Sequence, residues 1–272
     1  MSRLISLVAQ GLIYLLLGLA SFLSVFPFYW MLVGTTNTSA DIIKGKANFG
    51  AALGENAAKF FEQVDAPRVF FNSALIAVVA TIFTLAISSL AGYGFEMFRS
   101  KWRERIFALL LMMLAIPFAA LMIPLFIFMA KVGLINTYAA IVLPGVASIF
   151  IIFYFRQATK AFPAELRDAA KIDGLNEWQI FLHVYLPVMR PTYAAATIIV
   201  FMANWNNYLW PLIVLQTNDL KTITLVVSSL ASAYTPDFGV VMVGAILATL
   251  PTLILFFVLQ RRFVEGMLGA VK

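Results

Sequence analysis

The sequence predicts an all-α protein that crosses a membrane several times, and three observations support this fold class. Hydrophobic residues make up 62% of the 272 residues and charged residues only 12%, which does not fit a soluble surface. The mean hydropathy is +0.92. The 19 basic and 13 acidic residues also leave six uncharged segments of 23 to 37 residues. About 20 mainly apolar helical residues suffice to cross a hydrocarbon layer roughly 30 Å thick.

Each uncharged segment is long enough for one spanning helix, so we expect a single transmembrane domain over residues 1–272. The first segment, 4–40, is too long for a signal peptide and lacks a small-residue cleavage site, which predicts a helix that is retained. The six expected helices lie near residues 8–33, 70–95, 106–130, 134–156, 191–215 and 239–260.

The distribution of charge predicts the orientation of these helices. With the N-terminus in the cytoplasm, thirteen basic residues fall on the inner side and six on the outer side, as the positive-inside rule requires. Both termini are therefore expected in the cytoplasm. The inner excess faces anionic lipid headgroups and accounts for the net charge of +6, so no nucleic-acid partner is indicated. The inner basic residues are Arg3, Arg99, Lys101, Arg103, Arg105, Arg156, Lys160, Arg167, Lys171, Arg190, Arg261, Arg262 and Lys272.

The composition also excludes several kinds of site. The chain has no cysteine and one histidine, His183, which leaves little with which to build a metal centre or a thiol nucleophile. Gly45-Lys46 lacks the upstream glycine of a phosphate-binding P-loop. We therefore expect no cofactor in this chain and no enzymatic activity.

Two polar segments have a helical pattern of their own. The outer segment 35–68 contains an amphipathic stretch near Ala57–Val64 that is typical of a short surface helix. The inner loop 157–190 is organised as helix, glycine, helix. Pro163 suits the first turn of its first helix, and Gly174 suits the left-handed residue that ends it. Asn176 with Gln179 predicts a capping box that opens the second helix.

This inner loop carries a specific sequence pattern. Most loops of this kind are solvated connectors, but here Asp168-Ala169-Ala170 is followed by Gly174, Ile180 and Leu186-Pro187. The pattern resembles the EAA loop of binding-protein-dependent ABC importer permeases, with aspartate in place of the usual glutamate. The resemblance covers nearly the whole chain and is to the sugar-importer branch that contains the smaller maltose-transporter permease. Further matching segments are Phe71-Asn72-Ser73, Ser89–Tyr93, Pro124-Leu125, Gly133–Thr137, Trp205–Leu212 and Gln260–Val264.

The resemblance implies a transport subunit in a bacterial or archaeal cytoplasmic membrane. It implies a second homologous permease, a dimer of cytoplasmic ATPase subunits that binds ATP and Mg²⁺, and an extracytoplasmic sugar-binding protein that meets the outer loop 216–237. Leu166, Ala169 and Ala170 would pack into the ATPase, and Arg167 would join acidic neighbours in ion pairs at the rim. The implied coupling residues are Glu165, Leu166, Asp168, Ala169, Ala170, Asp173 and Gly174.

The solute pathway is expected to consist of neutral groups, because the spanning segments contain no charge. The fifth span has the densest polar and aromatic group, in which Asn204, Asn207 and Tyr208 share a helical face with Pro211. With Trp205 they form the candidate pathway, since amides pair with sugar hydroxyls and aromatic rings with sugar C–H groups. An alternative interpretation has equal weight: the asparagines form hydrogen bonds between helices, and the tryptophans lie in an aromatic belt at the membrane interface.

These features favour a permease subunit of an ATP-driven importer for a neutral di- or oligosaccharide. An importer for glycerol phosphate is the nearest alternative and would need a cation near the pathway. A secondary carrier would need an embedded carboxylate or histidine for ion coupling. A scaffold would not need the helix-glycine-helix loop, and a membrane enzyme would need a cluster of acids, bases or metal ligands.

Overall fold

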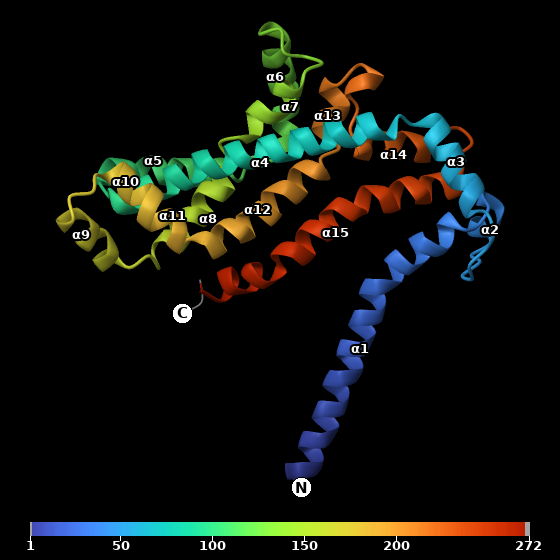
Figure 1. The fold of residues 1–272 in the computed structure, drawn as a ribbon, viewed down its shortest axis with the longest axis horizontal. Helices are drawn as coiled ribbons and strands as arrows, with labels where there is room; N and C mark the ends of the chain where they lie inside the picture. The colour runs from blue at the N-terminus through green and yellow to red at the C-terminus, as the bar shows by residue number, and fades with distance from the viewer. Residues whose placement is uncertain (1, 270–272) are drawn as a thin grey trace. The chain divides into compact units, whose positions relative to one another are not determined.

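The computed structural model describes residues 2–269, and every regular element in that range is helical. The all-α fold class is thereby confirmed (Figure 1). The chain forms two compact units, one of residues 1–66 and 226–250 and one of residues 67–225 and 251–272. Lys272, one of the basic residues counted on the inner side, lies outside the described residues.

The first unit contains a long apolar helix and a small polar cap. Its elements are α1 (Ser2–Thr35), α2 (Ser39–Ile43), α3 (Leu53–Gln63), and parts of α14 (Ile223–Ala231) and α15 (Phe238–Gly269). The helix α3 is the predicted surface helix: Phe60 is buried, whereas Phe61 is exposed. Residues 10–28 of α1 are exposed along their whole length in the isolated chain.

Buried amides hold this first unit together. The Asn56 side chain on α3 donates to the carbonyls of Thr35 (2.8 Å) and Asn37 (2.9 Å), just beyond the end of α1. Ser39 donates to the Asp237 carboxylate at 2.8 Å and accepts from the Phe238 amide, which opens α15. These bonds satisfy backbone groups that the helix ends leave free.

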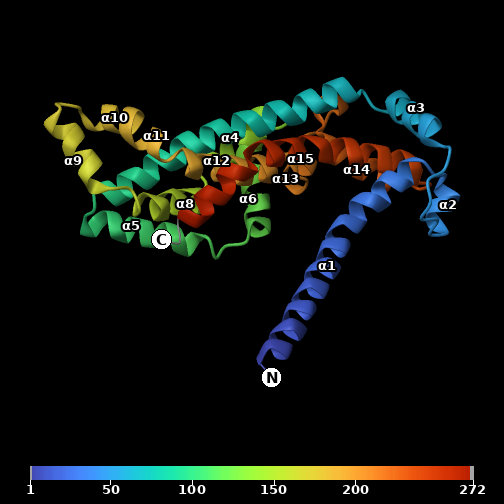
Figure 2. The ribbon, with the colours of Figure 1, turned by 60° about the horizontal axis from the view of Figure 1, so that its bottom comes forward.

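The second unit contains the remaining elements. It is built around α4, α8 and α12, which run alongside one another in both views (Figures 1 and 2). Its main core cluster includes Ile76, Ala80, Ile141, Trp210 and Val214. The elements are α4 (Ala66–Met97), α5 (Lys101–Met113), α6 (Phe118–Lys131), α7 (Tyr138–Val142), the 3₁₀ turn η1 (Leu143–Gly145), α8 (Ile149–Thr159), α9 (Ala164–Ile172), α10 (Glu177–Ile180), the π-helical turn η2 (Phe181–Tyr185), α11 (Leu186–Val188), α12 (Arg190–Trp205), α13 (Leu209–Val214) and η3 (Asn218–Leu220).

The six expected spans correspond to helices, but only three of them are continuous. Within the described residues, Gln10–Thr35, Ala66–Met97 and Phe238–Arg261 are each long and apolar enough to cross a membrane. Three bent helix pairs bring the number of candidate spans to six when each pair counts as one span. The prediction that residues 106–130, 134–156 and 191–215 each form one continuous helix was therefore wrong.

Each interruption has a local cause. Between α5 and α6 the chain bends by 100°, because Pro117 has no amide hydrogen and keeps the preceding residue out of the helical region. Between η1 and α8 it bends by 42°; Pro144 lies in the 3₁₀ turn and Ser148 caps α8 by accepting from the Ile151 amide. The third pair bends by 80° at Met189, and α12 ends at Trp205, four residues before α13 begins.

Two helices of the second unit approach unusually closely at Gly92 of α4. A Cβ atom at Gly92 would lie 2.7 Å from the Phe155 Cβ and 2.8 Å from the Arg156 amide nitrogen, both on α8. A backbone atom at that distance cannot move aside without shifting the helix. The absence of a side chain at Gly92 therefore sets the distance between α4 and α8.

We predict that Gly92→Ala destabilises the protein, because the added methyl group forces α4 and α8 apart at a cost of about 1–3 kcal/mol. The measurement is the thermal unfolding midpoint of the purified protein in detergent. Gly94→Ala is the matched control, since a Cβ atom there meets nothing within 4 Å. Equal midpoints for the two variants would contradict the close packing of α4 on α8.

Candidate functional site

The loop of residues 157–190, which resembles an EAA loop and is called by that name below, folds as its sequence predicts. α9 ends in a reversal at Gly174, whose φ of 83° lies in the left-handed region. The Gly174 backbone amide donates to the Lys171 carbonyl, and the Leu175 amide donates to the Ala170 carbonyl. This is a Schellman pattern, which satisfies the last carbonyls of α9. Asn176 and Gln179 then form the predicted capping box through two bonds of 2.9 Å. The helix-glycine-helix organisation is confirmed.

The predicted coupling residues divide into two groups by burial. Six of them are exposed, namely Glu165, Leu166, Asp168, Ala169, Asp173 and Gly174. Ala170, by contrast, is only 6% exposed and is already covered within the chain. The reason is the reversal itself, which folds α10 and η2 back against α9 and covers this face within the chain.

Two apolar side chains of the loop are exposed that the sequence reasoning did not single out. Ile172 is 87% exposed and Trp178 is 57% exposed. Ile172 follows Ala169 by three residues, so an apolar side chain at helical spacing from the predicted face was the available signal. Together with Leu166 they give the loop an apolar surface that water does not favour.

Glu177, at the first position of α10, is the centre of charge in the loop. Its carboxylate accepts bonds from Arg167 (2.5 Å to Oε1 and 3.3 Å to Oε2) and from the Tyr93 hydroxyl (3.1 Å), and it pairs with Lys171 at 2.9 Å. Arg167, which was expected in an ion pair at the rim, is thus paired with Glu177 within the chain. Burial raises the pKa of the Glu177 carboxyl, but the bonds from Arg167, Lys171 and Tyr93 outweigh it and leave the pKa below its ordinary value.

An aromatic cluster packs beside this centre and includes Tyr93. Tyr93 of α4 is 4.8 Å from Tyr185 and 5.3 Å from Phe181 between ring centroids. Tyr185 also contacts Phe162 and shares a hydrogen bond of 2.7 Å with the Thr159 hydroxyl. All four rings are buried, so the start of the loop, its second helix and the end of α4 form one packed group.

A second ionic group is buried beside the first. Arg156 of α8 pairs with Glu96 of α4 at 3.3 Å and with Glu104 of α5 at 2.5 Å, and its guanidinium lies 4.1 Å from the Phe107 ring centre. The side chains of Arg156 and Glu96 are 8% and 6% exposed. The sequence had placed both among the surface charges of the inner side. Removing one partner would leave the other charge buried, which is costly.

The structure separates the four candidate pathway residues. Asn204 donates to the Val200 carbonyl one turn earlier on α12. Trp205 is 3% exposed and packs against Phe70 and Phe201. The shared helical face expected for Asn204, Asn207 and Tyr208 is absent, because α12 ends at Trp205 and the last two lie in the break before α13. Asn207 and Tyr208 are half-buried there.

The loop 216–223 is held by residues from two segments that are distant in the sequence, around Asn72 and around Asn136. Asn72 of α4 donates to the carbonyls of Asp219 (2.9 Å) and Lys221 (3.0 Å) and accepts from the Tyr138 hydroxyl. The neighbouring Ser73 accepts from the Ile223 amide at 2.8 Å. The position of this loop is therefore fixed by the outer end of α4.

Asn136 holds the other end of the same loop. Its φ of 63° is unusual for a residue with a side chain, and its backbone amide donates to the Val214 carbonyl at 2.8 Å. Its side-chain oxygen accepts from the backbone amides of Gln216 (2.9 Å) and Thr217 (3.1 Å). The segments around Asn72 and around Asn136 thus both form hydrogen bonds to the same loop.

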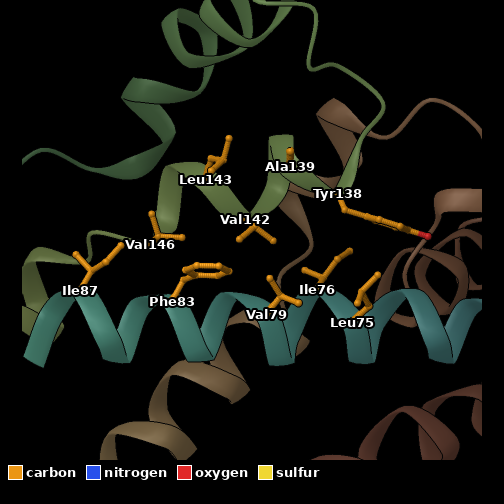
Figure 3. A pocket seen from close by; sticks show the side chains of 10 residues that line it. All are labelled: Leu75, Ile76, Val79, Phe83, Ile87, Tyr138, Ala139, Val142, Leu143 and Val146. Atoms are coloured by element: carbon orange, nitrogen blue, oxygen red, sulfur yellow. The ribbon is translucent and has the colours of Figure 1, made fainter. Parts of the chain in front are cut away.

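An apolar groove of about 420 Å³ lies between α4 and the pair α7 and η1. Figure 3 shows aliphatic and aromatic side chains such as Val79, Phe83 and Val142 facing one another across it. The single hydroxyl in its lining, that of Tyr138, already donates to Asn72. Without free polar groups this groove does not suit a sugar.

Residues 85–269 match the family described as binding-protein-dependent transport system inner membrane component. The chain belongs to this family. The permease is 69% identical to the lactose transport system permease protein LacG of Rhizobium radiobacter, over 95% of each chain. It is 34% identical to the arabinooligosaccharides transport system permease protein AraQ of Halalkalibacterium halodurans, over the full length of both.

A solved structure supports the fold of the permease. The chain is similar to a bacterial ABC transporter involved in the import of the acidic polysaccharide alginate, with a TM-score of 0.79 and 19% identity. The match covers 94% of this chain and 96% of that one. By its family and by these related permeases, the chain is a membrane transport subunit of the ABC-importer type, as its sequence predicted.

We predict that Gly174→Val leaves membrane insertion intact but uncouples transport from ATP hydrolysis. A β-branched residue at a φ of 83° is strained, so the reversal between α9 and α10 should open. The measurement is sugar uptake and ATP hydrolysis by the reconstituted importer. Asparagine tolerates the left-handed region, so Gly174→Asn should lose less activity than Gly174→Val. Normal uptake by the valine variant would contradict the role of the reversal.

Proposed function

We propose that this permease serves an ATP-driven importer for a neutral disaccharide or short oligosaccharide. The observation that carries the proposal is the 69% identity to a lactose permease, which extends over 95% of both chains. The similarity to an arabinooligosaccharide permease supports the same solute class. The charge-free spanning segments support a neutral solute, since a buried charge in a membrane needs a partner.

The break between α12 and α13 is the part of the second unit best suited to contact the solute. Asn207 and Tyr208 offer an amide and a phenol from non-helical backbone, which membrane proteins tolerate where it lines a cavity. Asn204 and Trp205 are engaged within the chain and would shape the break. We therefore assign solute contact to Asn207 and Tyr208 and support to Asn204 and Trp205.

The EAA loop would couple this pathway to the ATPase. Its exposed apolar side chains Leu166, Ala169, Ile172 and Trp178 would enter the ATPase surface as anchors. The exposed carboxylates Glu165, Asp168 and Asp173 would surround them and set register by charge. ATP and Mg²⁺ would bind to the ATPase dimer.

The remaining partners and the orientation follow from the same proposal. The permease would form a single transmembrane domain in the cytoplasmic membrane beside a second homologous permease, with both termini in the cytoplasm. The inner excess of basic residues supports this orientation. The outer loop 216–237, whose first part is fixed by Asn72 and Asn136, would meet the extracytoplasmic sugar-binding protein.

A glycerol-phosphate importer is the second candidate. The chain is 32% identical to the sn-glycerol-3-phosphate transport system permease protein UgpE of Agrobacterium fabrum, over 97% of its length. A phosphate group is best recognised by arginine or lysine. Segments 69–95 and 191–218 carry neither, which favours the neutral solute.

We predict that the permease takes up lactose into proteoliposomes when it is reconstituted with its partner permease and ATPase subunits. Uptake should require internal ATP and an external lactose-loaded binding protein, because this chain has no P-loop of its own. The measurement is accumulation of radiolabelled lactose. Labelled glycerol phosphate serves as the comparison; ATP-dependent uptake of it in preference to lactose would contradict the sugar assignment.

We predict that Asn207→Ala lowers the sugar uptake rate about fivefold at saturating loaded binding protein, the effect of losing one net hydrogen bond. The adjacent Asn206→Ala is the matched control, since Asn206 is the exposed C-cap of α12. Uptake and ATP hydrolysis are measured together. Equal uptake by both variants would argue that Asn207 does not contact the solute.

A further inference from the structure

The contacts of Glu177 join three parts of the chain that are separate in sequence. Arg167 and Lys171 belong to α9, the first helix of the EAA loop, and Glu177 opens the second helix. Tyr93 belongs to α4, 84 residues earlier in the chain. One carboxylate therefore connects the loop to a spanning helix.

The connection is well suited to transmit a displacement. The Arg167 guanidinium reaches both carboxylate oxygens, at 2.5 and 3.3 Å, and paired contacts of this kind fix orientation as well as distance. Its guanidinium also lies 5.2 Å from the Phe98 ring centre, just after α4 ends. The Tyr93 ring is 4% exposed and packed against Phe181 and Tyr185, so its hydroxyl cannot swing away.

We infer that Glu177 is a positioning residue that ties the EAA loop to α4 through the Tyr93 hydroxyl. A displacement of α9 then moves the cytoplasmic end of α4 with it. This inference rests on the proposed function, in which the ATPase displaces the loop.

A simpler role for Glu177 would be local. A carboxylate at the first position of α10 is stabilised by the helix dipole whatever Tyr93 does. The two roles differ in what the Tyr93 hydroxyl contributes: a local role predicts that its removal has no effect on coupling, and a transmitting role predicts a loss.

The experiment compares Glu177→Gln, Tyr93→Phe and the double variant in the complete importer in proteoliposomes. The measured quantity is sugar molecules taken up per ATP hydrolysed, together with co-purification of the ATPase subunit. Glu177→Gln should lower the ratio about tenfold, since it removes the charge-assisted bonds. Tyr93→Phe keeps the ring and should lower the ratio about threefold. The double variant should be no worse than Glu177→Gln, because both changes break one connection.

Glu62→Gln and Tyr14→Phe are the matched controls, since both side chains are exposed and lie on other helices. A normal ratio for Tyr93→Phe would overturn the inference, as would additive effects in the double variant. Loss of ATPase co-purification in both single variants would also overturn it, since the loop would then have lost its structure. Absence of ATP-dependent uptake by the unsubstituted complex would contradict the proposed function, and the inference with it.

Discussion

The second unit depends on one constraint, which is that a helix broken inside a membrane protein leaves amides and carbonyls that water cannot reach. Pro144 has no amide hydrogen for the Ala140 carbonyl, and the Trp210 indole donates to that carbonyl at 2.8 Å instead. Beyond the end of α13, the Asn136 side chain accepts from the exposed backbone amides of Gln216 and Thr217 and holds the chain that follows this helix. Side chains on one element thus complete the backbone bonding of another, and this is why the short helices α7 and α13 have fixed positions.

Side chains at the two ends of α4 also bond to other parts of the chain. At the outer end, Asn72 and Ser73 bond the loop Gln216–Ile223, which is expected to face the binding protein. At the other end, Tyr93 bonds Glu177 of the EAA loop. Gly92, one residue before Tyr93, sets the approach of α8. A single continuous helix therefore contacts both loops that partners would meet, and it is a natural route for transmitting movement between them.

The sequence predicted local features well where the cause was local. The reversal at Gly174 and the capping box of Asn176 and Gln179 follow from residue types a few positions apart, and both are confirmed. The helical break near Asn206 was missed, because an uncharged sequence indicates a long apolar segment but does not show whether its helix is straight. The burial of Ala170 and the exposure of Ile172 were also missed, since both depend on α10 and η2 folding back over α9.

The sequence by itself determined that the chain is helical, lies in a bilayer and contains a helix-glycine-helix loop like that of importer permeases. Hydropathy, charge spacing and turn residues are properties of neighbouring positions, so no three-dimensional information was needed. Only the tertiary structure decided which charges are buried and which residues meet. Arg156 with Glu96, and Glu177 with Tyr93, are 60 and 84 residues apart. Nothing in the local sequence marks these contacts, because helices that are distant in the chain meet only in the folded protein, where Arg156 and Glu96 become buried.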